Sequence, residues 1–389
     1  MEEVDKMSHR LRTCGAAAVL LLLLTLFSSC GQSAVQDETA TDYNQYIPSH
    51  GVTAYTKDLY IFFDSGRLFY VGRSQPSQLF PLCFQADCDH KNSSCTAWLN
   101  TPSRSIYAAG DNLYYIDADK DAKPALYRMD LSGGGRELVK SLNILNEESW
   151  PGISSLGYSF RVYGSYLAIE LNLLQEDSWQ HKIYLTGIDS KDEGVFLFGE
   201  EGDSDKSYIA IEFRENWLFV MEKNAADGTN TLWGYNFTTQ EAVPLVEGWD
   251  ISNCFTVQDG ILYWAVTGDG VYSMDMEKKS VTKHRSFDPV LEYGAAAYDD
   301  QYLYLTNAIR YMDSQGTVPA EERGVKVYDL QGNLQQFIPV PQESGNALLL
   351  LFTPGYAFFC DDRNGSYCPT LYLEKAAVSS GSAQMLPVG

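Results

Sequence analysis

The chain has 389 residues, with 51 acidic and 28 basic side chains and a formal net charge of −23. This acidic balance argues against nucleic-acid binding, because phosphates need cationic partners. It also argues against electrostatic adhesion to anionic lipid headgroups. It suits solubility outside a cell and could attract cations or basic partners.

Residues 1–29 are predicted to be a lipoprotein signal peptide. The apolar stretch around Leu20 to Leu24 is too short for a typical membrane span and leads into Leu26-Phe27-Ser28-Ser29-Cys30-Gly31. Small residues before Cys30 resemble the bacterial lipobox, although Phe27 stands where Leu is more usual. The resemblance implies that lipid on Cys30 holds the protein to the outer face of the cytoplasmic membrane. An ordinary cleaved signal and an uncleaved anchor are the alternatives.

Residues 30–50 follow as the lipidated cysteine and a polar segment without strand pattern, which we interpret as a flexible tether. Translation starts at Met1 or at Met7. A start at Met7 would remove three acidic residues and leave the basic leader that is typical of signal peptides.

One apolar strand pattern recurs seven times from residue 51 onward, about every 40 to 55 residues. Residues of turns, mainly Gly, Asp and Asn, come just before most copies. The copies begin at Leu59, Leu113, Tyr166, Trp217, Ile261, Leu303 and Tyr356.

A second strand follows each copy and in most cases ends in Asp or Asn, as in Leu126-Tyr127-Arg128-Met129-Asp130. A weaker strand follows it, and another short strand precedes each unit. Four antiparallel strands in each of about seven units predict an all-β fold, a β-propeller, over residues 51–389 as a single domain. A β-sandwich or two separate β-domains would not explain the repeated strand order. A propeller of six or eight blades is also compatible with the sequence.

The segment after the first unit contains Cys83-x4-Cys88-x-His90-x4-Cys95. Three thiols and one imidazole form a complete tetrahedral set for a structural zinc, and iron is the other metal that suits these ligands. The alternative is a local disulfide with one leftover thiol, for which Cys254 could supply the fourth sulfur. A full ligand set leaves no open position, so either outcome favours a structural role.

Two further cysteines, Cys360 and Cys368, flank a segment that contains Asn364-Gly365. Asn-Gly is a strong signal for a tight hairpin. The pattern therefore places the two cysteines nearly opposite each other on adjacent strands, where a disulfide would form. Two buried free thiols are the alternative.

No catalytic residue is assigned. The chain lacks the Gly-x-Ser-x-Gly, His-Glu-x-x-His and P-loop motifs. The pair Asp299-Asp300 could do glycosidase chemistry in principle, but it falls in an expected turn between strands. Three tryptophans, Trp150, Trp179 and Trp249, fall outside the repeated strands and are candidates for a ligand-binding face.

The repeated Leu-Tyr-Tyr and Leu-Tyr-x-x-Asp strands resemble the bacterial domain of unknown function 5050, a propeller similar to the low-density-lipoprotein-receptor-related type. The stretch Pro81-Leu82-Cys83 to Cys95-Thr96-Ala97 resembles a segment of lipoproteins from gut Firmicutes. These resemblances imply a fold and an envelope location, and no known activity. We expect a lipid-anchored binding or scaffold module for a peptide, protein or glycan. An envelope enzyme, a lyase or glycosidase using channel carboxylates, and a structural subunit of an envelope complex are the alternatives.

Overall fold

The computed structural model describes residues 53–389, apart from 57, 84, 93, 100–104, 176–177, 192–193, 200–204, 215, 250, 252–253, 310–311 and 313–317. The predicted signal peptide, Cys30 and the tether lie outside the described residues. Among the residues that are described, no helix combines the length and the apolar character that a membrane crossing requires.

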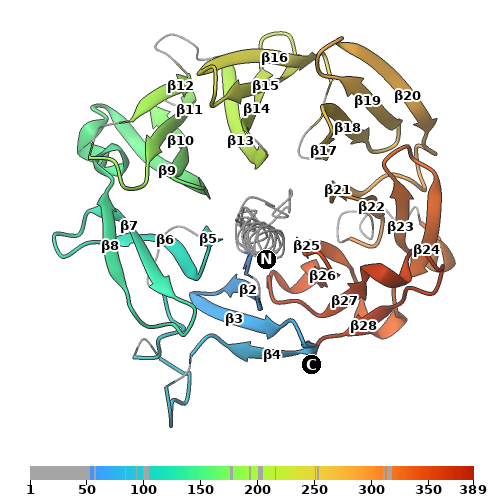
Figure 1. Cartoon of the computed structure of the whole chain (residues 1–389), viewed down its shortest axis with the longest axis horizontal. Coiled ribbons are helices and arrows are strands. Elements are labelled where there is room, and N and C mark those ends of the chain that lie inside the picture. Colours follow the sequence, from blue (N-terminus) through green and yellow to red (C-terminus); the bar gives the residue numbers. More distant parts are fainter. Residues whose placement is uncertain are drawn as a thin grey trace, which may run out of the picture.

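Within this part of the chain, seven four-stranded antiparallel sheets stand as blades around a central axis (Figure 1). The first three blades comprise β1 (Thr53–Tyr55), β2 (Leu59–Asp64), β3 (Arg67–Gly72), β4 (Gln75–Pro81); β5 (Ile106–Ala109), β6 (Asn112–Ala118), β7 (Pro124–Asp130), β8 (Glu137–Ser141); and β9 (Ile153–Tyr163), β10 (Tyr166–Gln175), β11 (Ser178–Gly187), β12 (Val195–Phe198). The 3₁₀ turns η2 (Asn143–Leu145) and η3 (Glu147–Ser149) connect blades two and three. The all-β propeller with four strands in each blade is therefore confirmed.

The remaining four blades repeat this order. They comprise β13 (Lys206–Arg214), β14 (Trp217–Asn224), β15 (Asn230–Asn236), β16 (Glu241–Glu247); β17 (Phe255–Gln258), β18 (Ile261–Val266), β19 (Gly270–Asp275), β20 (Ser280–Ser286); β21 (Ala295–Tyr298), β22 (Tyr302–Thr306), β23 (Gly324–Asp329), β24 (Leu334–Pro339); and β25 (Leu348–Phe352), β26 (Tyr356–Cys360), β27 (Leu371–Glu374), β28 (Met385–Pro387). Short 3₁₀ turns lie at η4 (Ala320–Glu322), η5 (Gln342–Ser344), η6 (Asp362–Asn364) and η7 (Lys375–Ala377).

The repeated Leu-Tyr-Tyr segments are the second strands of the blades. The four central residues of β2 are all buried, because each blade is packed between two neighbours and its inner strands have no solvent face. The outermost strands are the opposite, and every residue of β20 except Arg285 is exposed. This gradient explains why the second strand carries the strongest sequence pattern and the fourth the weakest.

The described residues form seven buried apolar clusters, one at each junction between neighbouring blades. At the junction of blades six and seven, for example, the rings of Tyr304 and Phe352 lie 4.7 Å apart. Removing such side chains from water is the main stabilising contribution to the ring. The aromatic residues of the repeat are thus first of all packing residues.

The ring closes between blade seven and blade one without exchange of a strand, since each sheet consists of consecutive strands. The ring of Phe358 lies 5.5 Å from that of Phe62 in the closing junction. The backbone N–H of Tyr367 donates to Asp64 Oδ1 at 2.9 Å, and the N–H of Leu79 donates to the carbonyl of Gly389 at 3.1 Å. Side chains and short backbone contacts therefore hold the two ends of the ring together.

The tight hairpin predicted at Asn364-Gly365 is wrong. Strand β26 ends at Cys360 and β27 begins only at Leu371, with η6 in the connection. Asp361 accepts a hydrogen bond from the N–H of Arg363 and begins this 3₁₀ turn, and Gly365, at φ +64°, ends it. Tyr367 lies in this connection and contacts Asp64 of blade one, so the connection contributes to ring closure.

Candidate functional site

The predicted metal ligands come together beside the junction of blades one and two. We call residues 82–99, which follow β4, the Cys/His loop. The donor atoms of Cys83, Cys88, His90 and Cys95 all lie within 4.8 Å of one another. His90 Nδ1 and Cys95 Sγ are 3.4 Å apart. These residues could hold a metal ion, as the sequence predicted.

Local turns of the backbone create this convergence. Asp87, directly before the second ligand, and His90, the third ligand, both have positive φ, at +63° and +56°, so the backbone turns at these two positions. The N–H of Cys95 donates to the carbonyl of Asn92 at 3.1 Å and forms a further turn. Cys95 is buried, whereas the other three ligands are half-buried.

The thiols of the cluster have unequal proton affinities. Burial opposes ionisation of Cys83, but hydrogen bonds from the Thr96 hydroxyl, the backbone N–H of Gln85 and Cys95 lower its pKa to about 6. Burial and the neighbouring Cys88 and Cys83 raise the pKa of Cys95 to about 11. Such an arrangement favours thiolate at Cys83.

The C-terminal part of the Cys/His loop contacts both neighbouring blades. From β3 of blade one, the N–H of Leu68 donates to the Ala97 carbonyl at 2.8 Å. From blade two, Arg136 Nη2 donates to the carbonyls of Thr96 and Trp98 at 2.6 Å and 2.8 Å. The loop therefore bridges two blades.

The other cysteines lie away from this cluster. Cys254 is buried among residues of blades five and six, so it is not the fourth sulfur that the disulfide alternative required. Cys360 and Cys368 are free thiols in the structure, and burial raises the pKa of Cys368 to about 11. Because Cys368 lies in the connection before β27, the predicted cross-strand placement is wrong. A disulfide between these two residues stays a prediction.

The three candidate tryptophans have different surroundings. Trp150 donates its Nε1–H to the Ile144 carbonyl at 2.8 Å and packs at the junction of blades two and three. Trp249 packs against Tyr272, with ring centroids 4.5 Å apart. Trp179 lies within β11, outside the repeated segment of that strand, and is 48% exposed. Only Trp179 of these three offers a large exposed aromatic surface.

The paired carboxylates in the turn between β21 and β22 are structural. Asp299 is fully buried, and its Oδ2 lies 2.7 Å from the ammonium group of Lys375 on η7. Burial raises the pKa of Asp299 and Lys375 opposes this effect. Asp299 Oδ1 also accepts hydrogen bonds from the N–H groups of Gln301 and Tyr302. The turn expected from the sequence is confirmed.

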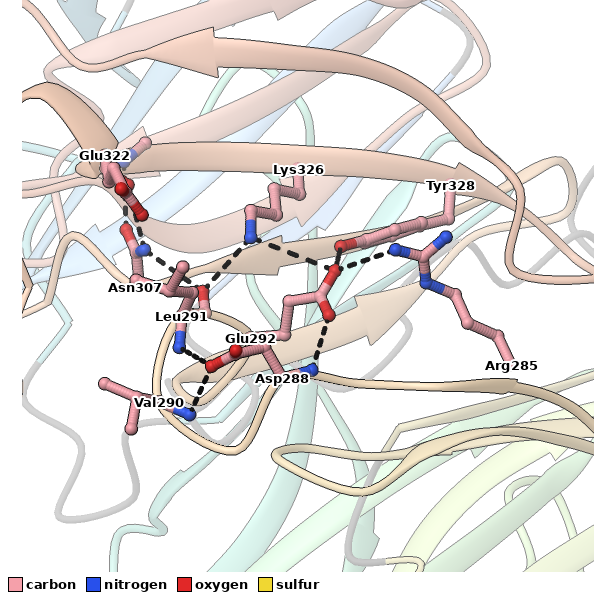
Figure 2. A network of polar contacts seen from close by, with 10 residues as sticks. Arg285, Asp288, Val290, Leu291, Glu292, Asn307, Glu322, Lys326 and Tyr328 are labelled. Carbon is pink, nitrogen blue, oxygen red and sulfur yellow. Dashed lines mark hydrogen bonds and ion pairs between the residues drawn. The ribbon is translucent and has the colours of Figure 1, made fainter.

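A second polar cluster, which the sequence did not reveal, joins blades five and six (Figure 2). Glu292, only 5% exposed, lies in the connection between β20 and β21. Its carboxylate accepts hydrogen bonds from the hydroxyl of Tyr328 and from the N–H of Asp288, and pairs with Arg285 Nη2 at 3.2 Å. Lys326 Nζ lies 3.8 Å from the same carboxylate (Figure 2).

The partners of Glu292 keep it ionised. Burial opposes ionisation, but the hydrogen bonds from Tyr328 and Asp288 and the charges of Lys326 and Arg285 hold its pKa below the usual value. The same network shields the carboxylate from solvent. The network therefore links blade five to blade six.

No family model matches the chain, and no curated protein matches it. The resemblance to domain of unknown function 5050 therefore stays an expectation, although the propeller that it implies is confirmed. Among solved structures, one chain from a structural analysis of two prolyl endopeptidases matches at 13% identity, with a TM-score of 0.53. The match covers 90% of this chain and 51% of that chain. This chain thus spans about half the length of that relative.

Two further matches are weaker. BamB of Moraxella catarrhalis is 10% identical over 80% of this chain and 82% of that chain, with a TM-score of 0.41. TolB of Acinetobacter baumannii is 14% identical over 71% of this chain and 61% of that chain, with a TM-score of 0.34. At 13% identity the prolyl endopeptidase match supports the fold class alone, and nothing is argued from the two matches with TM-scores below 0.5.

Proposed function

We propose that this chain is a lipid-anchored, extracytoplasmic propeller that acts as a binding or scaffold module for a peptide, protein or glycan. Two features support the proposal. The sequence before residue 53 resembles a lipoprotein signal, and a rigid ring presents loops and hairpins from a fixed frame.

The observation that favours binding over catalysis is that the buried carboxylates of Asp299 and Glu292 contact partners inside the protein. Asp299 pairs with Lys375, and Glu292 is held by Arg285 and Tyr328. A general acid or base must reach the substrate within hydrogen-bond distance, whereas these groups already contact internal partners. This favours a binding module over the lyase or glycosidase alternative.

The hairpin of β10 and β11 offers a suitable binding surface. Trp179 is exposed there, and side-chain hydrogen bonds cross the hairpin between Gln180 and Gln175 and between His181 and Asn172. An aromatic face stacks on sugar rings and peptide groups, and neighbouring amides give direction through hydrogen bonds. We therefore place the ligand contact on this hairpin.

The test is binding of the purified full chain to glycan and peptide arrays, followed by titration of the best ligand. We expect Trp179→Ala to weaken binding about tenfold or more with an unchanged melting temperature, because the ring is exposed. Phe80→Ala, at a 39% exposed aromatic of blade one, is the matched control and should bind normally. Equal binding by Trp179→Ala would contradict the placement, and conversion of the ligand into product would favour the enzyme alternative.

A further inference from the structure

We propose that the Cys/His loop binds one zinc ion in a closed, structural site that fastens the loop across the junction of blades one and two. Its ligands are Cys83, Cys88, His90 and Cys95. This inference goes beyond the proposed function, because it needs no ligand of the propeller and holds whichever molecule the propeller binds.

The donor spacing is compatible with a tetrahedral site. Typical zinc–sulfur and zinc–nitrogen bonds place two sulfurs about 3.8 Å apart and a sulfur and a nitrogen about 3.5 Å apart. His90 Nδ1 and Cys95 Sγ are 3.4 Å apart, and none of the four donor atoms is more than 4.8 Å from another. A disulfide would need one sulfur pair at about 2.05 Å, and the three cysteines are free in the structure.

The groups around the donors suit metal-bound thiolates. The N–H of Ala97 points to Cys95 Sγ at 3.4 Å, as a donor that stabilises negative charge on sulfur. The Thr96 hydroxyl donates a hydrogen bond to the Cys83 sulfur, which would accept it as a metal-bound thiolate as well. Both contacts orient ligands from outside the coordination shell.

The ligand types suit a structural zinc ion. Three thiolates and one imidazole form one of the donor sets of structural zinc. Four protein ligands fill a tetrahedral ion, so no position is left for water or substrate. The site therefore stabilises structure and does not carry out chemistry.

The position of the ligands explains what the ion would fasten. Cys83 directly follows Leu82, whose N–H donates to the Leu68 carbonyl of β3 at 2.9 Å. Cys95 directly precedes the segment that Arg136 of blade two binds. An ion held by Cys83 and Cys95 joins the two ends of the loop where they meet blades one and two.

The close packing of Gly133 in blade two shows how little space separates this blade from the Cys/His loop. It has φ +81°, and a Cβ there would approach the Leu82 carbonyl oxygen to 2.8 Å and Thr96 Oγ1 to 2.9 Å. The turn between β7 and β8 thus packs on both ends of the Cys/His loop. Loss of the ion should loosen this contact first.

The experiment is metal analysis of the full chain, purified under anaerobic, reducing conditions, with cobalt spectroscopy of the chelator-treated protein. We expect one zinc per chain and, after cobalt addition, the absorption bands of a tetrahedral thiolate site. Cys88→Ser and His90→Ala should reduce zinc to near zero, whereas Cys254→Ser, at a buried cysteine elsewhere, should keep one zinc.

Limited proteolysis of untreated and chelated wild-type protein keeps the test independent of how well the variants fold. We expect new cleavage between residues 85 and 94 after zinc removal, and protection when zinc is restored. A reduced protein that binds no zinc, a disulfide among the three cysteines in freshly isolated protein, or iron in place of zinc would overturn the proposal.

Discussion

At the scale of single residues, Glu292 shows how this propeller uses buried charge. The side chain lies between β20 and β23 and receives hydrogen bonds or ion pairs from Tyr328, Arg285 and Asp288 (Figure 2). Removing one member of a buried charge network leaves the other members desolvated and unpaired. The carboxylate is therefore expected to determine how firmly blades five and six are joined.

Replacing Glu292 with Gln is expected to lower the free energy of unfolding by about 2 kcal/mol, because Arg285 and Lys326 lose their shared counter-charge. Urea denaturation measures this change. Glu343→Gln, at an exposed acidic residue on η5, is the matched control and should stay within about 0.5 kcal/mol of the wild type. An equal effect in both variants would contradict the stabilising role of the Glu292 network.

The stability difference between the wild type and Glu292→Gln is expected to depend on pH. The pKa of Glu292 is lower in the folded chain than its usual value, so its contribution is present above the unfolded pKa and is lost as the pH falls through the folded one. The difference in stability between wild type and Glu292→Gln should be full above about pH 5 and shrink below about pH 4. A difference that stays constant down to pH 3 would show that the charge is not responsible.

At the scale of elements, the repeated strands could be predicted because one residue class meets one environment in every blade. The central residues of β2 and β26 are buried between neighbouring blades, and both strands carry the same aromatic pattern. The Cys/His cluster could be predicted because its ligands lie within 13 residues. Local sequence was sufficient wherever the partners are near in the chain.

Features that depend on distant contacts could not be predicted. Glu292 meets Tyr328, which lies 36 positions further on, and no motif joins the two residues. The connection after Cys360 runs to Leu371 and places Tyr367 on Asp64 across the closing junction, a contact that the Asn364-Gly365 pattern does not indicate. The sequence does not assign Trp179 to a strand, because β10 and β11 extend to 10 residues each, well beyond the repeated segment.

The turn between β7 and β8 supplies a prediction at this scale. Gly133→Ala should combine left-handed strain, about 1 kcal/mol, with a clash against the Leu82 carbonyl, and should destabilise the chain by about 2 kcal/mol or more. Gly110→Ala is the control, since Gly110 has φ +59° and nothing within 4 Å of a Cβ. Thermal unfolding of both variants measures the difference.

The two variants separate strain from contact. We expect Gly110→Ala to lose only the backbone contribution, and Gly133→Ala also to weaken zinc retention, because it displaces both ends of the Cys/His loop. Identical melting temperatures and identical metal content would contradict the packing of blade two on this loop.

At the scale of the whole molecule, stability is distributed around a ring. Among the described residues each junction between blades has its own apolar cluster, and the closing junction is built like the others, with rings such as Phe62 and Phe358 in contact. A ring with seven comparable junctions is a rigid frame. That frame suits a protein proposed to present binding surfaces from a membrane anchor.

The proposed anchor is tested directly on the whole protein. Intact mass analysis of detergent-extracted chain should show a lipid-modified N-terminal cysteine at Cys30, and Cys30→Ser should leave the protein unmodified and released from membranes on fractionation. An unmodified wild-type protein, or a Cys30→Ser variant that stays in the membrane fraction, would contradict lipid anchoring.

The most direct test of the account is a crystal structure of the full chain prepared anaerobically, with anomalous scattering measured at the zinc absorption edge. We predict one anomalous peak beside the junction of blades one and two, about 2.3 Å from the sulfurs of Cys83, Cys88 and Cys95 and about 2.1 Å from His90 Nδ1. A disulfide at this position, or reduced cysteines without an anomalous peak, would contradict the account.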